Sequence, residues 1–511
     1  MFDVLLVNPW AEPVHVSPSY QLIRDEIASA SSRLAVQRLQ AFFEKHARHI
    51  GEYTNVVQYQ HRLPFSSGLL SIGAVLEQDG FSVRCVSLAL EKKSANAQGD
   101  WLTDSLLEHA AQTRLAVGVT AVTPEYPRAL AILKIIKARY PHLLTIIGGT
   151  HVTYLDGEAA SDPAVDIVVR GEGEDTIREL LRLRREGAPM ERVAGTTVCI
   201  DGEIRRNPDR PLLNLATLPS PAYHLLGEHA KRELYSPPTF TRGCPFACSY
   251  CVESLFWDRK LRHKDPKRFV DELEYIVKEM DWPFIHIADS TFGLNRSMTY
   301  ALCDELERRR LDAVFSVNVR PDLFQYMGDD LVHRLITLNF VEFYFGYESS
   351  DQQVLANLKR KQEPSMLHQA LLRLKELRVP FVKLYLIIGL PGDTHESMQN
   401  TINTIRRLLE EDLIYYATAK YFTPTPGTLH VDERQSEGYD LLTKDWSQFE
   451  RYNFPPVINH HHLSPIELEQ YLSLLQAAQL GVFRRRLGRD ENERERLSAW
   501  ASAHYLKKVY L

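Results

Sequence analysis

Three closely spaced cysteines are the feature of this sequence with the clearest chemistry. Cys244, Cys248 and Cys251 follow Gly243 at the spacing C-x3-C-x2-C, and they are half of the six cysteines in the chain. Thiolates are the natural ligands of iron–sulfur clusters and of zinc. A structural zinc site needs a fourth protein ligand, and no second C-x2-C follows. The spacing therefore favours a four-iron cluster with one open iron, and the alternative is three structural cysteines.

The other cysteines indicate a reducing compartment. Cys85, Cys199 and Cys303 stand singly in apolar or helical surroundings, which favours buried thiols over a disulfide framework. The first residues contain no basic region, and their apolar run is too short for the hydrophobic part of a signal sequence. No run reaches about 18 apolar residues, so we expect no membrane span. These features predict a cytoplasmic enzyme.

Length and charge limit the class of protein further. The chain has 511 residues, of which 44% are hydrophobic and 25% charged, and its net charge is −6. At about 150 residues per domain, this length predicts about three globular domains. The absence of a basic block argues against a nucleic-acid substrate.

The first two hundred residues alternate between apolar runs and helical patterns. Such alternation predicts a parallel, doubly wound sheet with helices on both faces. Residues 10–62 are hard to place, and we interpret them as an insertion after the first strand, with a helical stretch near residues 23–49. The expected strands are residues 4–7, 82–88, 115–119, 144–147 and 165–169, and the expected helices are residues 69–76 and 128–140.

Small and polar residues follow several of these strands. Asn8, residues 120–123 and the pair Gly148-Gly149 all come directly after an apolar run. In parallel sheets, ligands bind beyond the carboxyl ends of the strands, so these residues should meet at one site. Two adjacent glycines would let a bulky ligand approach the backbone, although they would also suit a tight turn.

A second domain begins after a break in the pattern. A hairpin turn is expected at residues 201–203, and the proline-rich residues 207–223 mark a boundary. From the cysteine stretch onward the strand–helix rhythm returns for six steps, which predicts an incomplete parallel barrel. Chemistry in barrels gathers at the carboxyl ends of the strands. The residues expected there are Asp289, Arg320, Glu348, Ser349, Gly389, Pro391 and Gly392.

The tail, from about residue 430, should form a smaller and mostly helical unit. Its adjacent His460, His461 and His462 invite a metal interpretation. Neighbouring residues in an extended chain point to opposite sides, which argues against their binding one ion together. A helix over residues 466–486, with Ser464 as its cap and Pro465 at its first position, should close the barrel or shape the substrate pocket.

The cysteine stretch and the strand ends after it resemble the radical SAM enzymes. The resemblance implies that Cys244, Cys248 and Cys251 bind a [4Fe-4S] cluster whose open iron holds S-adenosylmethionine (SAM), and that Tyr250 lies near its adenine. It also implies SAM contacts at Asp289, Arg320, Glu348, Ser349, Gly389, Pro391 and Gly392. Among these we expect Glu348 to matter most, followed by Asp289 and Arg320.

The first domain resembles that of the cobalamin-binding subfamily of these enzymes. The resemblance rests on residues 64–70, on Gly148-Gly149-Thr150-His151 and on Arg170-Gly171-Glu172-Gly173-Glu174. The D-x-H-x-x-G motif that supplies an axial histidine in many cobalamin proteins is absent, and His151 suits a nucleotide-side or structural role better than a ligand role. Cobalamin contacts are implied at Asn8, Thr120, Thr123, Gly148, Gly149, Thr150 and His151.

The resemblance implies a domain organisation. Residues 1–200 would form a Rossmann-like cobalamin domain and residues 201–236 a linker. Residues 237–430 would form a partial (β/α)6 radical SAM barrel, and residues 431–511 a C-terminal unit that contributes to the substrate pocket.

The implied activity is methylation of an unactivated carbon of a small molecule by a radical and methylcobalamin. The enzyme would need an external electron donor of the flavodoxin or ferredoxin type. One alternative is a non-methylating reaction on the same architecture, such as cyclisation, rearrangement or oxidation. Another is a cobalamin or cluster sensor without catalysis.

Overall fold

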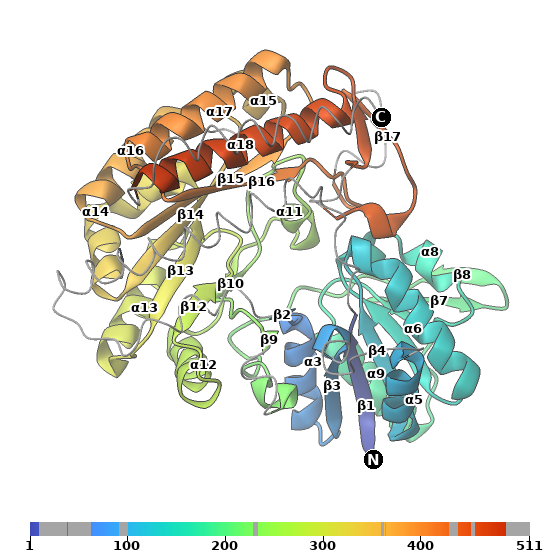
Figure 1. The fold of residues 1–511 in the computed structure, drawn as a ribbon. Coiled ribbons are helices and arrows are strands. Elements are labelled where there is room, and N and C mark those ends of the chain that lie inside the picture. Colours follow the sequence, from blue (N-terminus) through green and yellow to red (C-terminus); the bar gives the residue numbers. More distant parts are fainter. Residues whose placement is uncertain are drawn as a thin grey trace.

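A computed structural model describes residues 1–9, 38, 63–90, 101–227, 234–358, 362, 364–428, 438–450 and 455–486. Its described part contains two lobes, each built on a parallel sheet (Figure 1). Apart from residue 38, the expected helix near residues 23–49 and the predicted insertion at residues 10–62 lie outside the described residues. Within the described residues, no helix is long and apolar enough to cross a membrane.

The N-terminal lobe is a seven-stranded sheet with the strand order β3-β1-β4-β5-β6-β7-β8. The strands up to β6 are parallel, and β7 and β8 add an antiparallel hairpin at one edge. The strands are β1 (Phe2–Asn8), β3 (Val83–Ser87), β4 (Thr113–Thr120), β5 (Leu144–Gly148), β6 (Ile167–Val169), β7 (Thr196–Ile200) and β8 (Glu203–Arg206).

Helices cover both faces of this sheet, as the alternating pattern predicted. They are α3 (Ser67–Gln78), α5 (Trp101–Ala111), α6 (Tyr126–Arg139), α7 (Thr150–Tyr154), α8 (Asp156–Ala160) and α9 (Glu174–Glu186), with the 3₁₀ turn η2 (Thr123–Glu125) before α6. Leu5 and Leu6 of β1 point to opposite faces of the sheet, and they are 0% and 2% exposed, which confirms a strand buried on both faces. From β1 the chain passes to β3 on one side and then to β4 on the other, so the topological switch point lies between β1 and β4.

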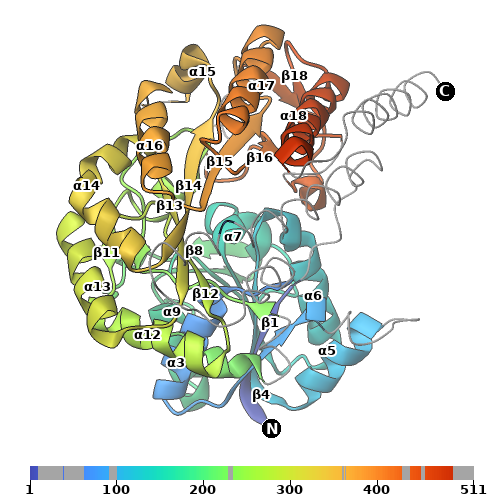
Figure 2. The ribbon, with the colours of Figure 1, turned by 60° about the vertical axis from the view of Figure 1, so that its left-hand side comes forward.

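The second lobe is a curved, five-stranded parallel sheet in the order β12-β13-β14-β15-β16. Figure 2 shows helices α12, α13, α14 and α16 in an arc outside these strands. The strands are β12 (Phe284–Ile287), β13 (Val314–Val319), β14 (Phe340–Glu348), β15 (Phe381–Ile388) and β16 (Tyr416–Tyr421). The helices are α12 (Pro266–Glu279), α13 (Arg296–Arg309), α14 (Pro321–Thr337), α15 (Gln352–Asn357), α16 (Pro364–Glu376) and α17 (His395–Glu410).

The strand that carries the cysteines does not join this sheet, unlike the first of the six predicted steps. It is the short β10 (Thr241–Arg242), and it pairs antiparallel with β11 (Arg262–His263). Just before β10, the chain runs beside the end of β12. There the N–H of Ala288 donates a backbone hydrogen bond to the carbonyl of Pro238. Pro237 and Pro238 have no N–H to donate, so this stretch cannot form a regular ladder. The cysteine loop and its helix α11 (Glu253–Phe256) therefore stand on a separate hairpin.

The described C-terminal residues close one edge of the half-barrel. Helix α18 (Pro465–Arg486) packs against α17 and β16. On it, the Gln479 side chain donates to the carbonyl of Ala417 at 2.9 Å and accepts from its N–H at 2.7 Å, which satisfies part of the open edge of β16. The unit also contains the antiparallel pair β17 (Tyr439–Leu441) and β18 (Ile458–His460) and the turn η4 (Trp446–Gln448).

The C-terminal unit also reaches the N-terminal lobe. Trp446 donates to Glu158 of α8 at 3.3 Å, and its ring lies 5.1 Å from that of His151. Between the lobes, β2 (Leu63–Pro64) pairs with β9 (Leu234–Tyr235), and η3 (Tyr223–Leu226) ends the proline-rich linker. The two lobes thus contact each other through several separate segments.

The close packing of Gly149 against the backbone of Ala121 can be tested by substitution. Gly149 has φ 113° and ψ 178°, a conformation that essentially only glycine adopts, and a Cβ there would lie 2.5 Å from the carbonyl oxygen of Ala121. We expect Gly149→Ala to lower the free energy of unfolding by about 3 kcal/mol. Gly80→Ala is the control, because Gly80 also has positive φ but open space around it, and it should cost only about 1 kcal/mol. Urea unfolding of both variants measures the difference, and equal losses would contradict this account.

Candidate functional site

The cysteine loop begins with a turn that only glycine can make. Gly243 has φ 104°, and a Cβ there would lie 2.0 Å from the carbonyl oxygen of Lys260. The loop therefore starts in a fixed position on the β10–β11 hairpin. Its first cysteine, Cys244, lies with its sulfur 4.0 Å from the hydroxyl of Thr291, just beyond β12.

The three cysteines are half-buried thiols that are not joined in disulfides. Burial raises the pKa of the Cys244 thiol, and it raises that of Cys251 to about 12, so both thiols would have to lose their protons before they could bind iron. No group of three His, Cys, Asp or Glu side chains among the described residues could hold a single metal ion. In a four-iron cluster each cysteine binds a different iron, so three thiols that are spread over one loop fit a cluster better than a single zinc ion.

Arg320 places a positive charge beside this loop. Its side chain is buried, and its guanidinium lies 3.7 Å from the sulfur of Cys248 and 3.7 Å from the ring centre of Phe246. Asp322 accepts two hydrogen bonds of 3.0 Å from the same guanidinium and so fixes its plane. The sequence placed Arg320 at the barrel mouth, and the structure brings it to the cysteine loop.

Tyr250 and Glu348 are joined directly. The Tyr250 hydroxyl donates to the Glu348 carboxylate at 3.0 Å, which links the cysteine loop to the end of β14. Glu348 has φ 64°, an unusual value for a long side chain, next to a register shift between β14 and β15. Backbone strain of this kind typically costs about 1–3 kcal/mol and gathers at functional sites. Beside it, Ser349 is buried and accepts a hydrogen bond from the N–H of Asp351.

Asp289 lies directly behind the loop and is fully buried. Its Oδ1 accepts the backbone N–H groups of Phe240 and Thr241 at 2.8 and 2.9 Å. Its Oδ2 is buried without a hydrogen-bond partner in the part of the chain that is described. Burial raises the pKa of Asp289 to about 6. In this structure the residue holds the strand that leads into the cysteine loop.

The turn after β15 is tightly packed. Gly389 and Gly392 both have positive φ, and a Cβ at Gly389 would lie 3.0 Å from Leu468 of α18. Asp393 accepts the N–H of Leu390 at 2.8 Å, and a ring nitrogen of His460 contacts the carbonyl of Leu390 at 3.0 Å. His460 therefore supports the turn that contains Pro391, which accounts for one member of the histidine triplet without a metal.

A cavity of about 360 Å³ lies between the carboxyl edge of the N-terminal sheet and the cysteine-bearing hairpin. It opens at the switch point, because both Leu6 of β1 and Thr120 of β4 line it. Small residues form much of its wall on the N-terminal side, namely Ser66, Ser67, Gly68, Thr120, Gly148, Gly149, Thr150, Gly171 and Gly173. The opposite wall includes Thr239, Thr241, Arg242, Gly243, Glu253, Trp257, Ala288 and Ser290.

This wall of small side chains suits a large, flat cofactor such as cobalamin. No histidine is among the described residues that line the cavity, which agrees with the absence of an axial-histidine motif. Of the predicted cobalamin contacts, Thr120, Gly148, Gly149 and Thr150 line the cavity, whereas Asn8, Thr123 and His151 do not. The second glycine is also required by the protein itself, because it contacts the backbone of Ala121.

The three predicted contacts that do not line the cavity make other interactions. Asn8 accepts the N–H of Ser66 at 3.1 Å and so fixes the start of α3. His151 is buried, 3.3 Å from the hydroxyl of Thr123 and next to Tyr126 and Trp446, and burial lowers its pKa to about 4. A neutral histidine in these surroundings supports the packing of the C-terminal unit on the N-terminal lobe.

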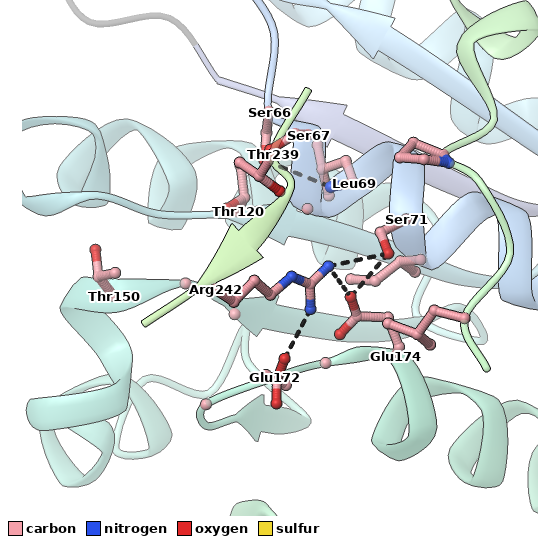
Figure 3. Close-up of a pocket in the computed structure, with 18 of the residues that line it drawn as sticks. Ser66, Ser67, Leu69, Ser71, Thr120, Thr150, Glu172, Glu174, Thr239 and Arg242 are labelled. Atoms are coloured by element: carbon pink, nitrogen blue, oxygen red, sulfur yellow. Dashed lines mark hydrogen bonds and ion pairs between the residues drawn. The ribbon is translucent and has the colours of Figure 1, made fainter. Parts of the chain in front are cut away.

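A buried ion network lines the cavity and joins its two walls (Figure 3). Arg242, two residues before Cys244, forms 2.7 Å ion pairs with both Glu172 and Glu174. Ser71 of α3 donates to Glu174 at 2.8 Å. Burial opposes the charged forms, but the ion pairs and hydrogen bonds outweigh it, so the pKa of Glu174 is lowered and that of Arg242 is raised. The sequence identified Glu172 and Glu174 only as part of a motif, and Arg242 was not identified at all.

Tyr154 is a second residue that sequence reasoning missed. It belongs to α7, yet its ring lies so close to Gly427 of the other lobe that a Cβ there would be 2.2 Å away. Its hydroxyl is buried without a hydrogen-bond partner within the described ranges. The nearby Gly427 could be recognised as a turn residue, but its partner is 273 positions away in sequence, and no local pattern connects them.

The concave face of the half-barrel is polar and aromatic. Lys383 pairs with Glu342 at 2.5 Å and contacts the hydroxyl of Tyr344 at 3.0 Å. The rings of Tyr344 and Tyr385 stack at 5.2 Å, and the ring of His286 lies 5.5 Å from that of Tyr344. These side chains alternate with apolar ones that face the outer helices.

Two family models match the chain. The model of the radical SAM superfamily matches residues 239–405, and the model of the B12 binding domain matches residues 63–181. The first range contains the cysteine loop and strands β12 to β15 of the half-barrel, and the second contains the small-residue wall of the cavity.

Individual proteins agree with this division. An uncharacterized methyltransferase of Pyrococcus horikoshii is 28% identical over 374 residues, which cover 72% of this chain and 78% of that protein. The anaerobic magnesium-protoporphyrin IX monomethyl ester cyclase of Rubrivivax gelatinosus is also 28% identical, over 70% of this chain and 64% of its own length. The radical S-adenosylmethionine methyltransferase TsrM from Kitasatospora setae, solved with cobalamin and a [4Fe-4S] cluster, shares the fold with a TM-score of 0.66. It is 17% identical, and the match covers 93% of this chain and 88% of TsrM.

Cys248 allows a direct test of cluster binding. We expect Cys248→Ala to abolish the [4Fe-4S] cluster after anaerobic reconstitution, because the cluster loses one of three protein ligands. Iron and sulfide analysis with the visible spectrum measures the loss. The control is Cys199→Ala, which changes an exposed thiol of the N-terminal lobe and should retain the cluster. A Cys248→Ala protein that still carries four irons would refute the assignment.

Asp289 should make stability depend on pH. Its folded pKa of about 6 lies above the ordinary value of 3.8, so its ionisation costs stability progressively as the pH rises through this window. Asp289→Asn keeps the oxygen that accepts both N–H groups but has no charge. The stability of the variant relative to the native protein should therefore increase from about pH 4 to about pH 6, by at most about 3 kcal/mol. Urea unfolding at several pH values measures this change, and a pH-independent difference would contradict it.

Proposed function

Because the chain belongs to the radical SAM enzymes that carry a B12 binding domain, we propose that it is a cobalamin-dependent methyltransferase acting on an unactivated carbon of a small molecule. The observation that carries the proposal is the cavity between the small-residue wall and the cysteine-bearing hairpin, to which both lobes contribute. When bound, the cluster with SAM would supply a 5′-deoxyadenosyl radical, and methylcobalamin would supply the methyl group.

The residues of the chain have separate roles in this proposal. Cys244, Cys248 and Cys251 bind the cluster, and Arg320 places a fixed positive charge beside it. Tyr250 and Glu348 are held by their mutual hydrogen bond at the position proposed for SAM. The turn at residues 389–392, with Gly389, Pro391 and Gly392, provides further proposed contacts to SAM. Asp289 contributes by fixing the entry to the loop, and Ser349 stands next to Glu348.

Cobalamin would lie against the carboxyl edge of the N-terminal sheet. The proposed contacts are Thr120, Gly148, Gly149 and Thr150, which line the cavity, with Asn8, Thr123 and His151 supporting the loops behind them. The lining offers no imidazole among its described residues, so we propose that cobalamin binds without a histidine ligand. The enclosed position between two lobes would exclude water from a reactive intermediate.

The substrate would face the concave side of the half-barrel. Its described side chains include the Lys383–Glu342 pair, the stacked Tyr344 and Tyr385, and His286. Such a surface offers hydrogen-bond partners and aromatic faces to a small polar molecule. We also propose an external electron donor of the flavodoxin or ferredoxin type.

A non-methylating reaction is the second candidate, because one of the relatives is a cyclase. Such a reaction would use the same two domains of this chain without net transfer of a methyl group. The two candidates differ in their products from SAM, and this difference does not require the substrate to be known.

The test is anaerobic reconstitution with iron, sulfide and hydroxocobalamin, followed by a strong reductant and SAM. A methyltransferase should convert its bound reduced cobalamin to methylcobalamin and release S-adenosylhomocysteine in equal amounts. Absorption spectra and chromatography measure both products. Formation of 5′-deoxyadenosine without methylcobalamin would favour the second candidate, and failure to retain cobalamin would contradict both the proposed cofactor site and the methylation.

A further inference from the structure

The Arg170-Gly171-Glu172-Gly173-Glu174 motif has a role that the proposed chemistry does not use. Glu172 and Glu174 are buried to 9% and 3% exposure, and buried carboxylates require partners. Their positively charged partners come from the cysteine-bearing hairpin. Arg242 pairs with both at 2.7 Å, and Arg262 pairs with Glu172 at 2.6 Å.

The two arginines are cross-strand neighbours on the cysteine-bearing hairpin. Arg242 and Arg262 are directly opposite each other in the β10–β11 register, so two like charges stand side by side. The ring of Trp257 lies 5.9 and 5.3 Å from their guanidiniums. The carboxylate of Glu172 bridges them, with one oxygen accepting from each arginine. The charges balance only when the two lobes are docked.

The motif is held firmly on its own side. Arg170 turns away from the hairpin and pairs with Asp209 at 2.7 Å within the N-terminal lobe. Glu174 starts α9, where the positive end of the helix dipole favours a carboxylate. The Oε2 of Glu172 also accepts the N–H of Leu213 from the linker. The carboxylates therefore belong to a rigid frame.

The hairpin transmits the position of Arg242 to the cluster. Only Gly243 separates Arg242 from Cys244, and its turn leaves no space even for a Cβ. Asp289 fixes the two residues on the other side, Phe240 and Thr241. A shift of the Arg242 backbone is therefore passed on to Cys244, the first proposed cluster ligand.

We infer that Glu172, Glu174, Arg242 and Arg262 form a positioning network that sets the separation between the cluster and the cobalamin. This inference rests on the proposed two-cofactor function. The network acts by fixing the cysteine-bearing hairpin on the lobe that holds the cobalamin. A buried network that is neutral only in one arrangement selects that arrangement over others, because each shifted one leaves an unpaired buried charge.

The test measures the distance between the cofactors rather than activity. The full-length protein is loaded with cobalamin and cluster and reduced to cob(II)alamin and the paramagnetic cluster. The magnetic coupling between the two centres is then recorded by electron paramagnetic resonance. The native protein should show one defined coupling. Glu172→Gln/Glu174→Gln should lose it or show a broad range of weaker couplings, since Arg242 and Arg262 are left without their carboxylates.

Two further variants make the result specific. Arg242→Lys keeps the charge but cannot form the forked pairs with both carboxylates, so it should fold and still show a weakened or broadened coupling. Glu179→Gln removes an ion pair to Arg210 within the N-terminal lobe and should keep the native coupling.

The outcomes separate the inference from the proposed function. A native protein without a bound cob(II)alamin signal would contradict the two-cofactor proposal itself. A native coupling that persists in both Arg242→Lys and the double glutamine variant, at equal cofactor content, would overturn the positioning role. Variants with lower stability but unchanged coupling would likewise show that the network only stabilises the fold.

Discussion

The residues that lead into Cys244 are fixed by carboxylates from two lobes, and the rest of the site depends on this constraint. Asp289 holds the backbone of Phe240 and Thr241 from the half-barrel side. Glu172 and Glu174 hold the Arg242 side chain from the N-terminal side. A cluster with only three protein ligands tolerates little change in their positions. The short β10 gains from these side chains the rigidity that a strand in a sheet would gain from its ladder.

The arrangement of the sheets explains why this point is central. The half-barrel sheet is parallel and the N-terminal sheet is parallel from β3 to β6, so the loops that follow these strands gather at one edge of each sheet. The N-terminal sheet presents its carboxyl edge to the cavity, and the cysteine-bearing hairpin forms the opposite wall. Residues that are far apart in sequence, such as Tyr154 and Gly427, also come into contact between the two lobes. The site belongs to neither lobe alone.

The sequence was sufficient for those features that local patterns determine. Buried strands such as β1, the cysteine spacing and the order of the two domains followed from periodicity and motif. The failure of β10 to join the half-barrel sheet follows from Pro237 and Pro238, whose effect on the ladder depends on which strand lies beside them. The pairing of Arg242 with Glu172 joins residues that are 70 positions apart, and only the fold brings them together.

The contact between Trp446 and Glu158 has a consequence for the synthesis of the chain. These residues are 288 positions apart. At about 5–20 residues per second, a ribosome needs roughly 15–60 s to pass from one to the other. During that interval the N-terminal lobe leaves the ribosome without its C-terminal cover, and the edge of its sheet faces solvent. The contact between Trp446 and Glu158 can therefore form only after this interval, as one of the last contacts between the two lobes.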